Sequence, residues 1–420
     1  MQDFRNLVIS VIGGGGVYTP ELVDYLAQNS CILGDMEVRL MDIDDERLGI
    51  VGGLCERIVQ KRKANINVSY CKTYKDAVTG ADFVLIQFRV GGEDSRISDE
   101  KLGQKYGLPF VETVGICGFS TFLRTYCEVE KLVRIIVSNA PDAWVINFTN
   151  PAGMISEAIN KLGIEKVVGV CNSSLTFLEY VKKKLGVDNI FMNWRGLNHF
   201  TFVDKIMVNG ENLFGKFVEF VDDNDVPCPF SKELIQTLGF IPNYYLQYYF
   251  FQKEVSKKQQ KLKKVRSEIV KEVNRELLEL YRRIDYIPDG LKKRGGYGYS
   301  KVVVELIKGM VTGDHSIHYA VVKNEKTLLE IPDDGFVEVP IVTIKNGFRT
   351  IQVEPLPNSV RGIVMNMKTY EQMLINGLRS RKRELLLTAL LIHPFIGDWK
   401  LANNILSDVL MENSRYMQGF

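Results

Sequence analysis

Short apolar runs alternate with amphipathic segments in the first part of the chain. Six of these runs predict β-strands, at residues 6–12, 37–43, 66–71, 81–88, 143–149 and 166–171. The segments between them, such as residues 19–28 and 130–140, space their apolar residues as a helix does. Continuous apolar strands that alternate with helices are typical of a parallel sheet buried on both faces. The pattern therefore predicts an α/β fold with a doubly wound sheet.

Beyond residue 190 the pattern changes to mixed strands and long helices. Residues 199–208 and 336–344 predict strands, and residues 252–283 predict one long polar helix. The basic run KKQQKLKKVR within that helix is typical of a solvated face, so we assign it no function. No Pro/Ser-rich linker separates the two patterns, which indicates a packed boundary without a flexible tether.

The length of the chain favours two domains, because 420 residues exceed the size at which a single core usually stops growing. We expect a Rossmann-like doubly wound domain over residues 1–190. We expect a mixed α+β domain over residues 191–420.

Composition and charge exclude several classes of protein. Hydrophobic residues make up 45% and charged residues 25% of the chain, which is typical of a soluble globular protein. The 53 basic and 51 acidic residues leave a net charge of +2, so the chain lacks the basic excess that nucleic-acid binding needs. No uninterrupted apolar stretch is long enough to span a membrane, and no charged leader precedes the first glycines. We expect neither nucleic acid nor a membrane as a partner.

The seven cysteines are scattered, odd in number, and form no CxxC pair. This usage argues against a disulfide framework and against a thiolate zinc site. A reducing compartment fits best, so we expect a cytoplasmic protein.

A glycine-rich turn follows the first predicted strand. It consists of Gly13, Gly14, Gly15, Gly16 and Val17. Glycines let the backbone approach a pyrophosphate, whose charge is favoured by the free N–H groups where a helix starts. The strict G-x-G-x-x-G pattern is not met, because Tyr18 stands three residues after Gly15. Taken alone, the turn fits either a cofactor site or a structural turn.

The second predicted strand strengthens the cofactor interpretation. Asp42 stands near its end, 27 residues after Gly15. In dinucleotide-binding folds, a carboxylate at this place accepts hydrogen bonds from the ribose hydroxyls of NAD. The acidic residue therefore favours NAD over NADP.

Few residues can serve a histidine-dependent site, since the chain has four histidines. Cys171 ends the last apolar run, and His199 stands where the sheet pattern gives way to the second domain. A thiolate and an imidazole could together hold a divalent ion and leave positions open for substrate oxygens. Spacing alone also fits a buried structural cysteine and a hydrogen-bonded histidine.

An ordered series of motifs resembles glycoside hydrolase family 4. The segments are VIGGGGVYTPEL, FRVGGEDSRISDEKLGQKYGL, ETVGICG, NFTNPAGM, GVCNSS, GLNHF, IPNYYLQYY, LKKRGGYGYS, VEVP and HPFIGDWKLANNIL. They cover nearly the whole chain. The resemblance implies an NAD-binding Rossmann-like domain followed by an α+β domain, similar overall to lactate and malate dehydrogenases.

The resemblance also implies an unusual hydrolysis of 6-phosphorylated sugars, which differs from the two-carboxylate mechanism of most glycosidases. NAD takes hydride from C3, a tyrosine removes the C2 proton, and the aglycone leaves by elimination. Water then adds, and the hydride returns to C3. A divalent metal, usually Mn²⁺, would polarise the sugar oxygens.

The motifs assign roles to individual residues. Cys171 and His199 match the metal ligands of the family. Tyr245 matches the catalytic base, with Tyr244 as the alternative. Glu112 and Thr113 match a pair that lines the cofactor side.

Three further residues match contacts to the phosphosugar: Arg96, Asn150 and Arg294. An arginine fork suits a phosphate dianion. Without the motif, Arg96 also fits a surface ion pair with Asp99 or Glu100, and Arg294 also fits a helix cap.

Asn172 bears on the stereochemistry of the reaction. α-Specific members of the family are expected to carry an aspartate there that protonates the leaving oxygen, whereas an asparagine cannot act as an acid. We therefore expect a 6-phospho-β-glucosidase, and the resemblance to the family implies a homodimer or homotetramer.

The chain departs from the family at residues 115–118, where Gly-Ile-Cys-Gly replaces a Pro-Gly-Gly pattern. Two alternative functions stay open, and this change supports only the second of them. One is an NAD-dependent 2-hydroxy-acid dehydrogenase, which would need a catalytic histidine paired with an aspartate. The other is a degenerate member that binds NAD and a sugar phosphate as a sensor.

Overall fold

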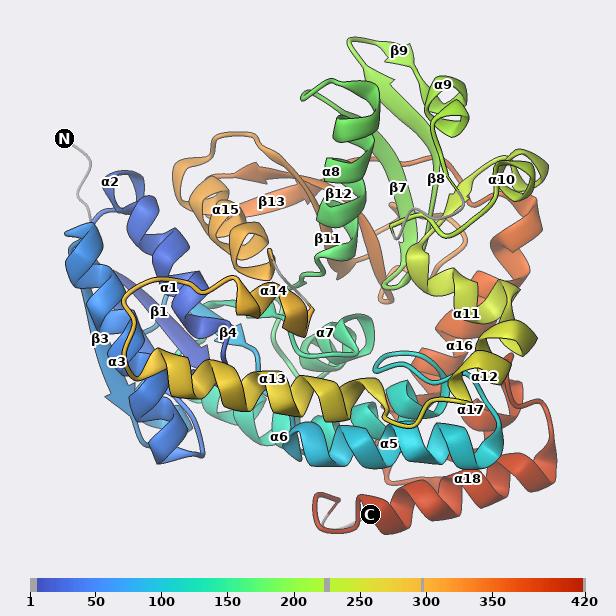
Figure 1. Ribbon diagram of the computed structural model, residues 1–420, viewed down its shortest axis with the longest axis horizontal. Helices are drawn as coiled ribbons and strands as arrows, with labels where there is room; N and C mark the ends of the chain where they lie inside the picture. The colour runs from blue at the N-terminus through green and yellow to red at the C-terminus, as the bar shows by residue number, and fades with distance from the viewer. Residues whose placement is uncertain (1–5, 223–226, 296–297, 418–420) are drawn as a thin grey trace.

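One mixed β-sheet runs through the molecule (Figure 1). The computed structural model describes residues 6–222, 227–295 and 298–417. Within these residues the sheet has 13 strands. The first six are β1 (Leu7–Ile12), β2 (Met36–Met41), β3 (Ile66–Cys71), β4 (Phe83–Ile86), β5 (Trp144–Asn147) and β6 (Val167–Gly169). The others are β7 (Phe191–Leu197), β8 (Phe200–Val208), β9 (Glu211–Asn212), β10 (Ile241–Pro242), β11 (Ile317–Lys323), β12 (Phe336–Ile344) and β13 (Gly347–Thr350).

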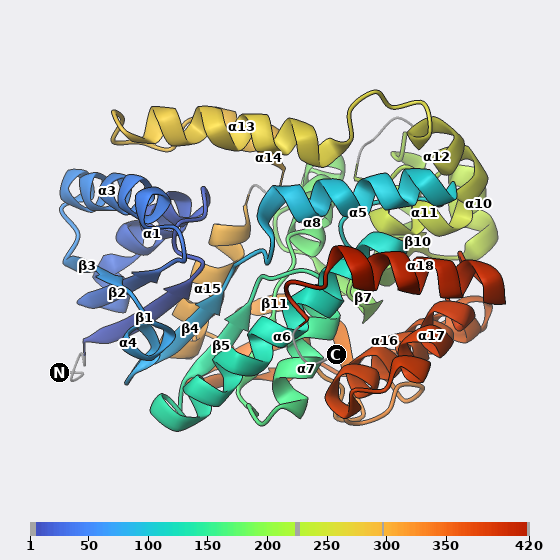
Figure 2. The same cartoon turned by 90° about the horizontal axis from the view of Figure 1, so that it is seen from below.

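The first six strands form the parallel half of the sheet, in the order β3-β2-β1-β4-β5-β6. This is the strand order of dinucleotide-binding folds. All six coincide with apolar runs of the sequence. Helices cover both faces, with α1 (Thr19–Gln28) and α3 (Asp45–Arg62) on one side and α4 (Tyr74–Val78) and α6 (Gly115–Asn139) on the other (Figure 2). The predicted doubly wound α/β class is confirmed. The helices of this half are α1 (Thr19–Gln28), α2 (Ser30–Leu33), α3 (Asp45–Arg62), α4 (Tyr74–Val78), α5 (Gly92–Tyr106), α6 (Gly115–Asn139), α7 (Ala152–Lys161) and α8 (Ser173–Leu185).

The later strands continue the same sheet with antiparallel pairing. β11 joins β6 through Val321 and Gly169, and β12 joins β7 through Glu338 and Gly196. β7 and β8 form a hairpin. The helices of this half are α9 (Phe214–Glu219), α10 (Lys232–Leu238), the 3₁₀ helix η1 (Tyr244–Leu246), α11 (Gln247–Phe250), α12 (Gln252–Gln259), α13 (Arg266–Tyr281), α14 (Gly290–Arg294), α15 (Tyr299–Thr312), α16 (Asn358–Ser380), α17 (Arg383–Ile392) and α18 (Trp399–Glu412).

The prediction of one continuous helix over residues 252–283 is wrong. The segment forms α12 and α13, with a break at residues 260–265. α13 has its own start signal, because the carboxylate of Glu268 accepts a hydrogen bond from the N–H of Val265 at 2.9 Å. The lysines crowded into the break also repel one another in a helix.

Helix α13 bridges α3 and α5. It crosses the front of the view in Figure 1 and packs against α3 at one end and α5 at the other, and Figure 2 shows it beside α5. It also packs against α14, the short helix that carries Arg294. α13 therefore brings a residue from late in the chain to the first βα turn.

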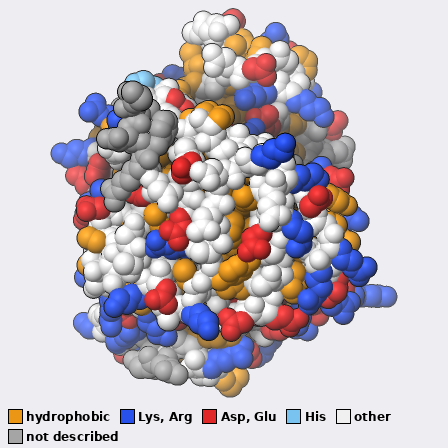
Figure 3. Space-filling view, turned by 90° about the vertical axis from the view of Figure 1, so that its left-hand side faces the viewer, with side chains coloured by type: hydrophobic (Ala, Val, Ile, Leu, Met, Phe, Trp, Pro, Cys, Tyr) orange, Lys and Arg blue, Asp and Glu red, His pale blue; other side chains and the backbone are white. Residues whose placement is uncertain are grey.

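The molecular surface carries both signs of charge. Acidic and basic side chains are interspersed over the face in Figure 3, which belongs to the side where α2, α3 and β3 lie in Figure 1. Among the residues that the structure describes, no helix is both long and apolar enough to cross a membrane.

Candidate active site

The glycine turn is packed tightly between the ends of two strands. The N–H groups of Gly13 and Gly14 both donate to the carbonyl of Met41, at 2.9 and 2.8 Å. Gly13 has a φ of +91°, and a Cβ atom there would lie 2.8 Å from the backbone nitrogen of Phe88. A side chain at Gly13 would therefore clash with the backbone that follows β4 and strain its own backbone.

Asp42 lies directly against this turn. The N–H of Gly15 donates to Oδ2 of Asp42 at 2.9 Å, and a Cβ atom on Gly15 would lie 2.8 Å from that oxygen. The side chain of Asp42 is half-buried, and the neighbouring Ile43 is 91% exposed. The carboxylate therefore stands at the open rim of the turn, where a ribose could reach it.

Two residues at the end of the turn connect it to the C-terminal half. The hydroxyl of Tyr281 donates to the carbonyl of Val17 at 2.7 Å. The hydroxyl of Tyr18 donates to the carbonyl of Gly295, and the guanidinium of Arg294 lies 4.9 Å from the centre of the Tyr18 ring. The predicted phosphate ligand Arg294 thus lies against Tyr18, the residue that directly follows the predicted cofactor turn.

Arg96, on α5, belongs to a buried cluster of ion pairs. Its Nη1 lies 3.6 Å from Oε2 of Glu112, and its Nε lies 3.2 Å from Oε1 of Glu100. Arg89, which follows β4, pairs with Oε1 of Glu112. The ion pair of Arg96 with Glu100 exists, but both side chains are buried instead of lying on the surface.

Arg294 reaches the same cluster from α14. Its Nη2 lies 3.6 Å from Oε1 of Glu93, and its Nε donates to Oδ1 of Asn274 at 2.8 Å. Oε1 of Glu93 also lies 3.4 Å from Nε of Arg89. Arg89, Arg96 and Arg294 therefore converge from three elements, and such an arrangement suits a phosphate dianion.

The charges of this cluster depend on one another. Burial opposes ionisation of Glu112, but Arg89 and Arg96 outweigh that effect and hold the pKa of Glu112 well below its ordinary value. Burial also opposes the charge on Arg96, but Glu112 and Glu100 raise the pKa of Arg96. Burial, together with the charge of Arg89, lowers the pKa of Arg294. An anion bound beside Arg294 would relieve this imbalance.

The two predicted metal ligands meet at a distance that fits a shared cation. Sγ of Cys171 lies 3.2 Å from Nε2 of His199. At zinc-like bond lengths of about 2.3 Å to sulfur and about 2.1 Å to nitrogen, with bond angles of roughly 90–110°, the two atoms lie roughly 3.1–3.6 Å apart. The described residues contain no group of three or more His, Cys, Asp and Glu side chains that could hold a metal. Other ligands would therefore come from water, amides or substrate.

His199 is presented by the tip of the β7–β8 hairpin. Asn198 and His199 form its two-residue turn, and His199 adopts the left-handed φ of +61°. The amide of Asn198 donates to Oε2 of Glu338 at 2.8 Å, and the indole of Trp194 donates to Oε1 at 3.0 Å. Glu338 thus anchors the hairpin tip to β12.

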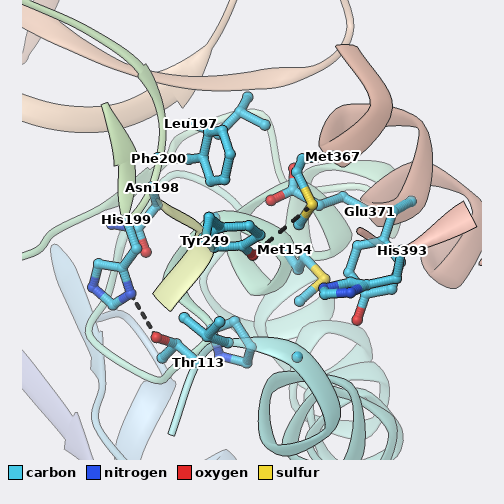
Figure 4. A pocket seen from close by; sticks show the side chains of 15 residues that line it. Thr113, Met154, Leu197, Asn198, His199, Phe200, Tyr249, Met367, Glu371 and His393 are labelled. Carbon is cyan, nitrogen blue, oxygen red and sulfur yellow. Dashed lines mark hydrogen bonds between the residues drawn. The ribbon is translucent and has the colours of Figure 1, made fainter. Parts of the chain in front are cut away.

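Two other predicted site residues contact the imidazole of His199. The ring of Tyr245 stacks on it, with centroids 3.7 Å apart and planes at 17°. Oγ1 of Thr113 lies 2.6 Å from Nδ1 of His199 (Figure 4). Since Glu112 pairs with the arginines and Thr113 contacts His199, these adjacent residues place the arginine cluster beside the two predicted metal ligands.

Burial controls the protonation of this centre. It lowers the pKa of His199 to about 4, so the imidazole is neutral near pH 7. It raises the pKa of Tyr245 well above its ordinary value, and the neighbouring Cys171 adds to the effect. Tyr245 is therefore a phenol in the protein alone, and a base function needs positive charge brought by bound groups.

Two asparagines complete the set of predicted residues. Oδ1 of Asn150 is buried and has no hydrogen-bond partner among the described residues, as expected for an atom that meets a ligand. Asn172 directly follows Cys171 and is the N-cap of α8.

Tyr244 is less well placed than Tyr245. Its ring packs edge-on against Tyr245, with centroids 5.5 Å apart. Only Tyr245 of this pair stacks on His199, so the geometry favours the tyrosine that the sequence indicates.

Three residues of the site were not predicted: Arg89, Tyr299 and Glu338. The hydroxyl of Tyr299 lies 4.0 Å from Sγ of Cys171, and burial raises the pKa of Tyr299. All three stand within the quoted motifs FRVGG, GGYGYS and VEVP. The signal was therefore present, but the sequence alone does not give the contacts.

A small cavity is lined in part by His199 and Thr113. Its volume is about 30 Å³, which suits a water molecule but not a sugar phosphate. Figure 4 shows Met154, Met367 and Tyr249 around it, with Glu371 and His393 as polar groups.

Known proteins match the chain over nearly its whole length. The model of the family 4 glycosyl hydrolases matches residues 8–187, and that of the family's C-terminal domain matches residues 194–396. The chain is 34% identical to the 6-phospho-beta-glucosidase BglT of Thermotoga maritima, over 98% of this chain and 99% of the relative.

Solved structures agree with these matches. A structure of the Thermotoga maritima 6-phospho-beta glucosidase with manganese, NAD⁺ and glucose-6-phosphate superposes with a TM-score of 0.92 at 33% identity, covering 98% of this chain and 99% of that one. Malate dehydrogenase of Cryptosporidium parvum gives a TM-score of 0.58 at 18% identity, covering 90% of this chain and 100% of that one, which confirms the expected likeness of fold. The chain belongs to glycoside hydrolase family 4.

Proposed function

We propose that this protein is a 6-phospho-β-glucosidase that depends on NAD and a divalent metal ion, with Mn²⁺ as the expected metal. The observation that carries the proposal is the contact of Cys171, His199 and Tyr245 beside an arginine cluster. A redox elimination on a phosphosugar requires ligands for one metal ion, a base and a site for the phosphate anion. The 34% identity to a 6-phospho-beta-glucosidase supports the same conclusion.

Bound groups would supply chemistry that the chain lacks: reversible oxidation at sugar C3 from NAD, and Lewis-acid polarisation of sugar oxygens from the metal. Gly13 to Val17 and Asp42 would hold NAD at the first βα turn. Cys171 and His199 would hold the metal. Tyr245 would remove the C2 proton, because it lies against the metal pair.

The arginine cluster would recognise the 6-phosphate. Arg96 and Arg294 are the proposed ligands, and Asn150 offers a buried oxygen without a partner among the described residues. Glu112 and Thr113 stand between the cluster and the metal pair, and their predicted place on the cofactor side stays a prediction. The third arginine, Arg89, would help to balance the phosphate charge.

The β-specificity rests on Asn172. It follows the proposed metal ligand Cys171 at the start of α8, so it would lie close to the reacting sugar, but an amide cannot protonate a leaving oxygen. Leaving-group protonation would then depend on water or on another acid.

Neither alternative function has comparable support. A 2-hydroxy-acid dehydrogenase needs a histidine paired with an aspartate, whereas His199 contacts Cys171, Thr113 and Tyr245. The sensor alternative rests on the changed segment 115–118, which the structure shows as the first turn of α6.

We also propose a cytoplasmic homodimer or homotetramer. This proposal rests on the resemblance to the family. Light scattering with size-exclusion chromatography would measure the subunit number. The division of the chain at residue 190 stays a prediction, since one sheet crosses it.

The decisive test is release of p-nitrophenol from its 6-phospho-β-glucoside, with NAD and Mn²⁺ each added or withheld and the α-anomer in parallel. We expect turnover of the β-substrate only when both are present, without net formation of NADH. Stoichiometric NADH would favour a dehydrogenase. Binding of NAD without cleavage of either anomer would favour the sensor.

A further inference from the structure

The backbone and the ring plane of His199 are both fixed by the fold. The left-handed turn at the hairpin tip sets the direction of its Cα–Cβ bond, and Asn198 ties that tip to Glu338. The stacked ring of Tyr245 sets the plane of the imidazole. A metal ligand needs more than this, because it must also aim one particular nitrogen.

Stacking cannot choose between the two flipped orientations of the ring. A half-turn about the Cβ–Cγ bond keeps the imidazole in the same plane but exchanges its nitrogen positions for carbon positions. Only polar contacts in that plane distinguish the two orientations. The structure shows one such contact at each nitrogen: Oγ1 of Thr113 at 2.6 Å from Nδ1, and Sγ of Cys171 at 3.2 Å from Nε2.

The position of the ring proton follows from the same contacts. A neutral imidazole carries one N–H, and the nitrogen that binds a metal must offer a lone pair. Since Nε2 faces Cys171, the proton belongs on Nδ1, where the hydroxyl of Thr113 is close enough to accept it. Figure 4 shows this hydrogen bond on the side of the ring away from Nε2.

We propose that Thr113 is a positioning residue for His199. Its hydroxyl accepts the Nδ1–H hydrogen bond and keeps Nε2 deprotonated and aimed at the metal position beside Cys171. The inference rests on the metal site of the proposed function. It gives Thr113 a role toward the metal instead of toward the cofactor.

The fold holds Thr113 firmly enough for this role. Val111 and Val114, on either side of it, form an antiparallel β-bridge. Helix α6 begins at Gly115, directly after Val114. A Cβ atom on Gly118 would lie 2.6 Å from the carbonyl oxygen of Thr113, so the first turn of α6 packs directly on this backbone. Although the segment 115–118 departs from the family pattern, its last glycine still allows this contact.

The test is the Mn²⁺ affinity of the full-length protein, measured by electron paramagnetic resonance of free Mn²⁺ without substrate. Thr113→Val removes the hydroxyl at nearly constant shape, and Thr113→Ser keeps it. Loss of such a supporting hydrogen bond typically weakens metal binding by about 10- to 100-fold. We expect that loss in Thr113→Val and near wild-type affinity in Thr113→Ser. NAD affinity, measured separately, should be unchanged in both.

His199→Ala separates this inference from the proposed function. If the wild type binds Mn²⁺, His199→Ala loses it, and Thr113→Val binds it as tightly as the wild type, the inference is wrong while the metal site stands. Equal weakening in Thr113→Val and Thr113→Ser would also overturn it, because packing would then matter instead of the hydroxyl. Loss of NAD affinity alone would return Thr113 to the cofactor side. If His199→Ala binds Mn²⁺ like the wild type, both proposals fail.

Discussion

The ring of Tyr245 lies flat on the imidazole of His199, with centroids 3.7 Å apart. A base and a metal ligand are thereby held in one stack, so that a positive charge at the metal acts directly on the phenol. This is the condition under which a buried tyrosine, whose pKa is otherwise raised, can lose its proton.

Tyr245→Phe keeps this stack and removes the base. We expect kcat to fall by about 100-fold or more, the usual worth of a general base, while NAD and Mn²⁺ affinities stay near those of the wild type. Turnover of the p-nitrophenyl 6-phospho-β-glucoside measures this. Tyr244→Phe is the matched control, and a larger loss in the control would assign the base to Tyr244.

Arg96→Lys keeps a positive charge in the arginine cluster but removes the guanidinium group that can bind two phosphate oxygens at once. We expect the affinity for glucose 6-phosphate to fall by about 10- to 100-fold, which corresponds to about 1.5–3 kcal/mol for hydrogen bonds to a charged group. Inhibition by glucose 6-phosphate and by glucose would be compared. Equal loss for both sugars would show that Arg96 does not recognise the phosphate.

Gly13→Ala places a Cβ atom 2.8 Å from the nitrogen of Phe88 in a left-handed backbone. We expect a loss of about 1–3 kcal/mol in the free energy of unfolding from overpacking, and weaker NAD binding. Gly49→Ala in α3 is the control, because its Cβ would meet no atom within 4 Å. That variant should gain about 0.5–1 kcal/mol. Unchanged stability of Gly13→Ala in urea would contradict the tight packing of the turn.

His393 makes stability depend on pH. Burial lowers the pKa of His393 from its ordinary 6.5 to about 3, and its Nδ1 accepts the N–H of Phe395 at 3.1 Å. In the unfolded chain the same imidazole takes up a proton near pH 6.5. Its contribution is therefore complete above about pH 6.5 and is lost as the pH falls toward about 3, by up to about 1.4 kcal/mol per pH unit.

His393→Asn tests this dependence, because the amide oxygen can accept the same hydrogen bond without titrating. The free energy of unfolding, measured in urea from pH 7 to pH 4, should fall less steeply in the variant by about that slope. Parallel curves for the two proteins would show that His393 is charged or exposed in the folded state.

The sequence predicts the parallel half of the sheet well, because its strands are buried on both faces and are therefore continuously apolar. Cys171 was predicted for the same reason: it ends such a run. The break between α12 and α13 was missed, since it depends on a carboxylate at Glu268 that reaches back to Val265. A helical period continues through such a break.

Contacts between distant segments were beyond prediction. The motifs select Thr113, His199 and Tyr245, but nothing in their spacing shows that Thr113 would face an imidazole 86 residues later. Arg89 differs from Arg96 in the same motif only by its contacts. Such relationships exist only once the sheet has brought the segments together.

The order of the strands implies that a metal held by Cys171 and His199 would also stabilise the sheet. Cys171 follows β6 and His199 follows β7, and these strands are separated in the sheet by β11 and β12, which are joined to them through the single pairs at Gly169 and Gly196. A cation held by both residues would connect β6 and β7 across the two strand junctions that have only one paired residue each. Because a ligand that binds only the folded form stabilises it, metal saturation should slow amide exchange at those junctions more than in β1 to β3.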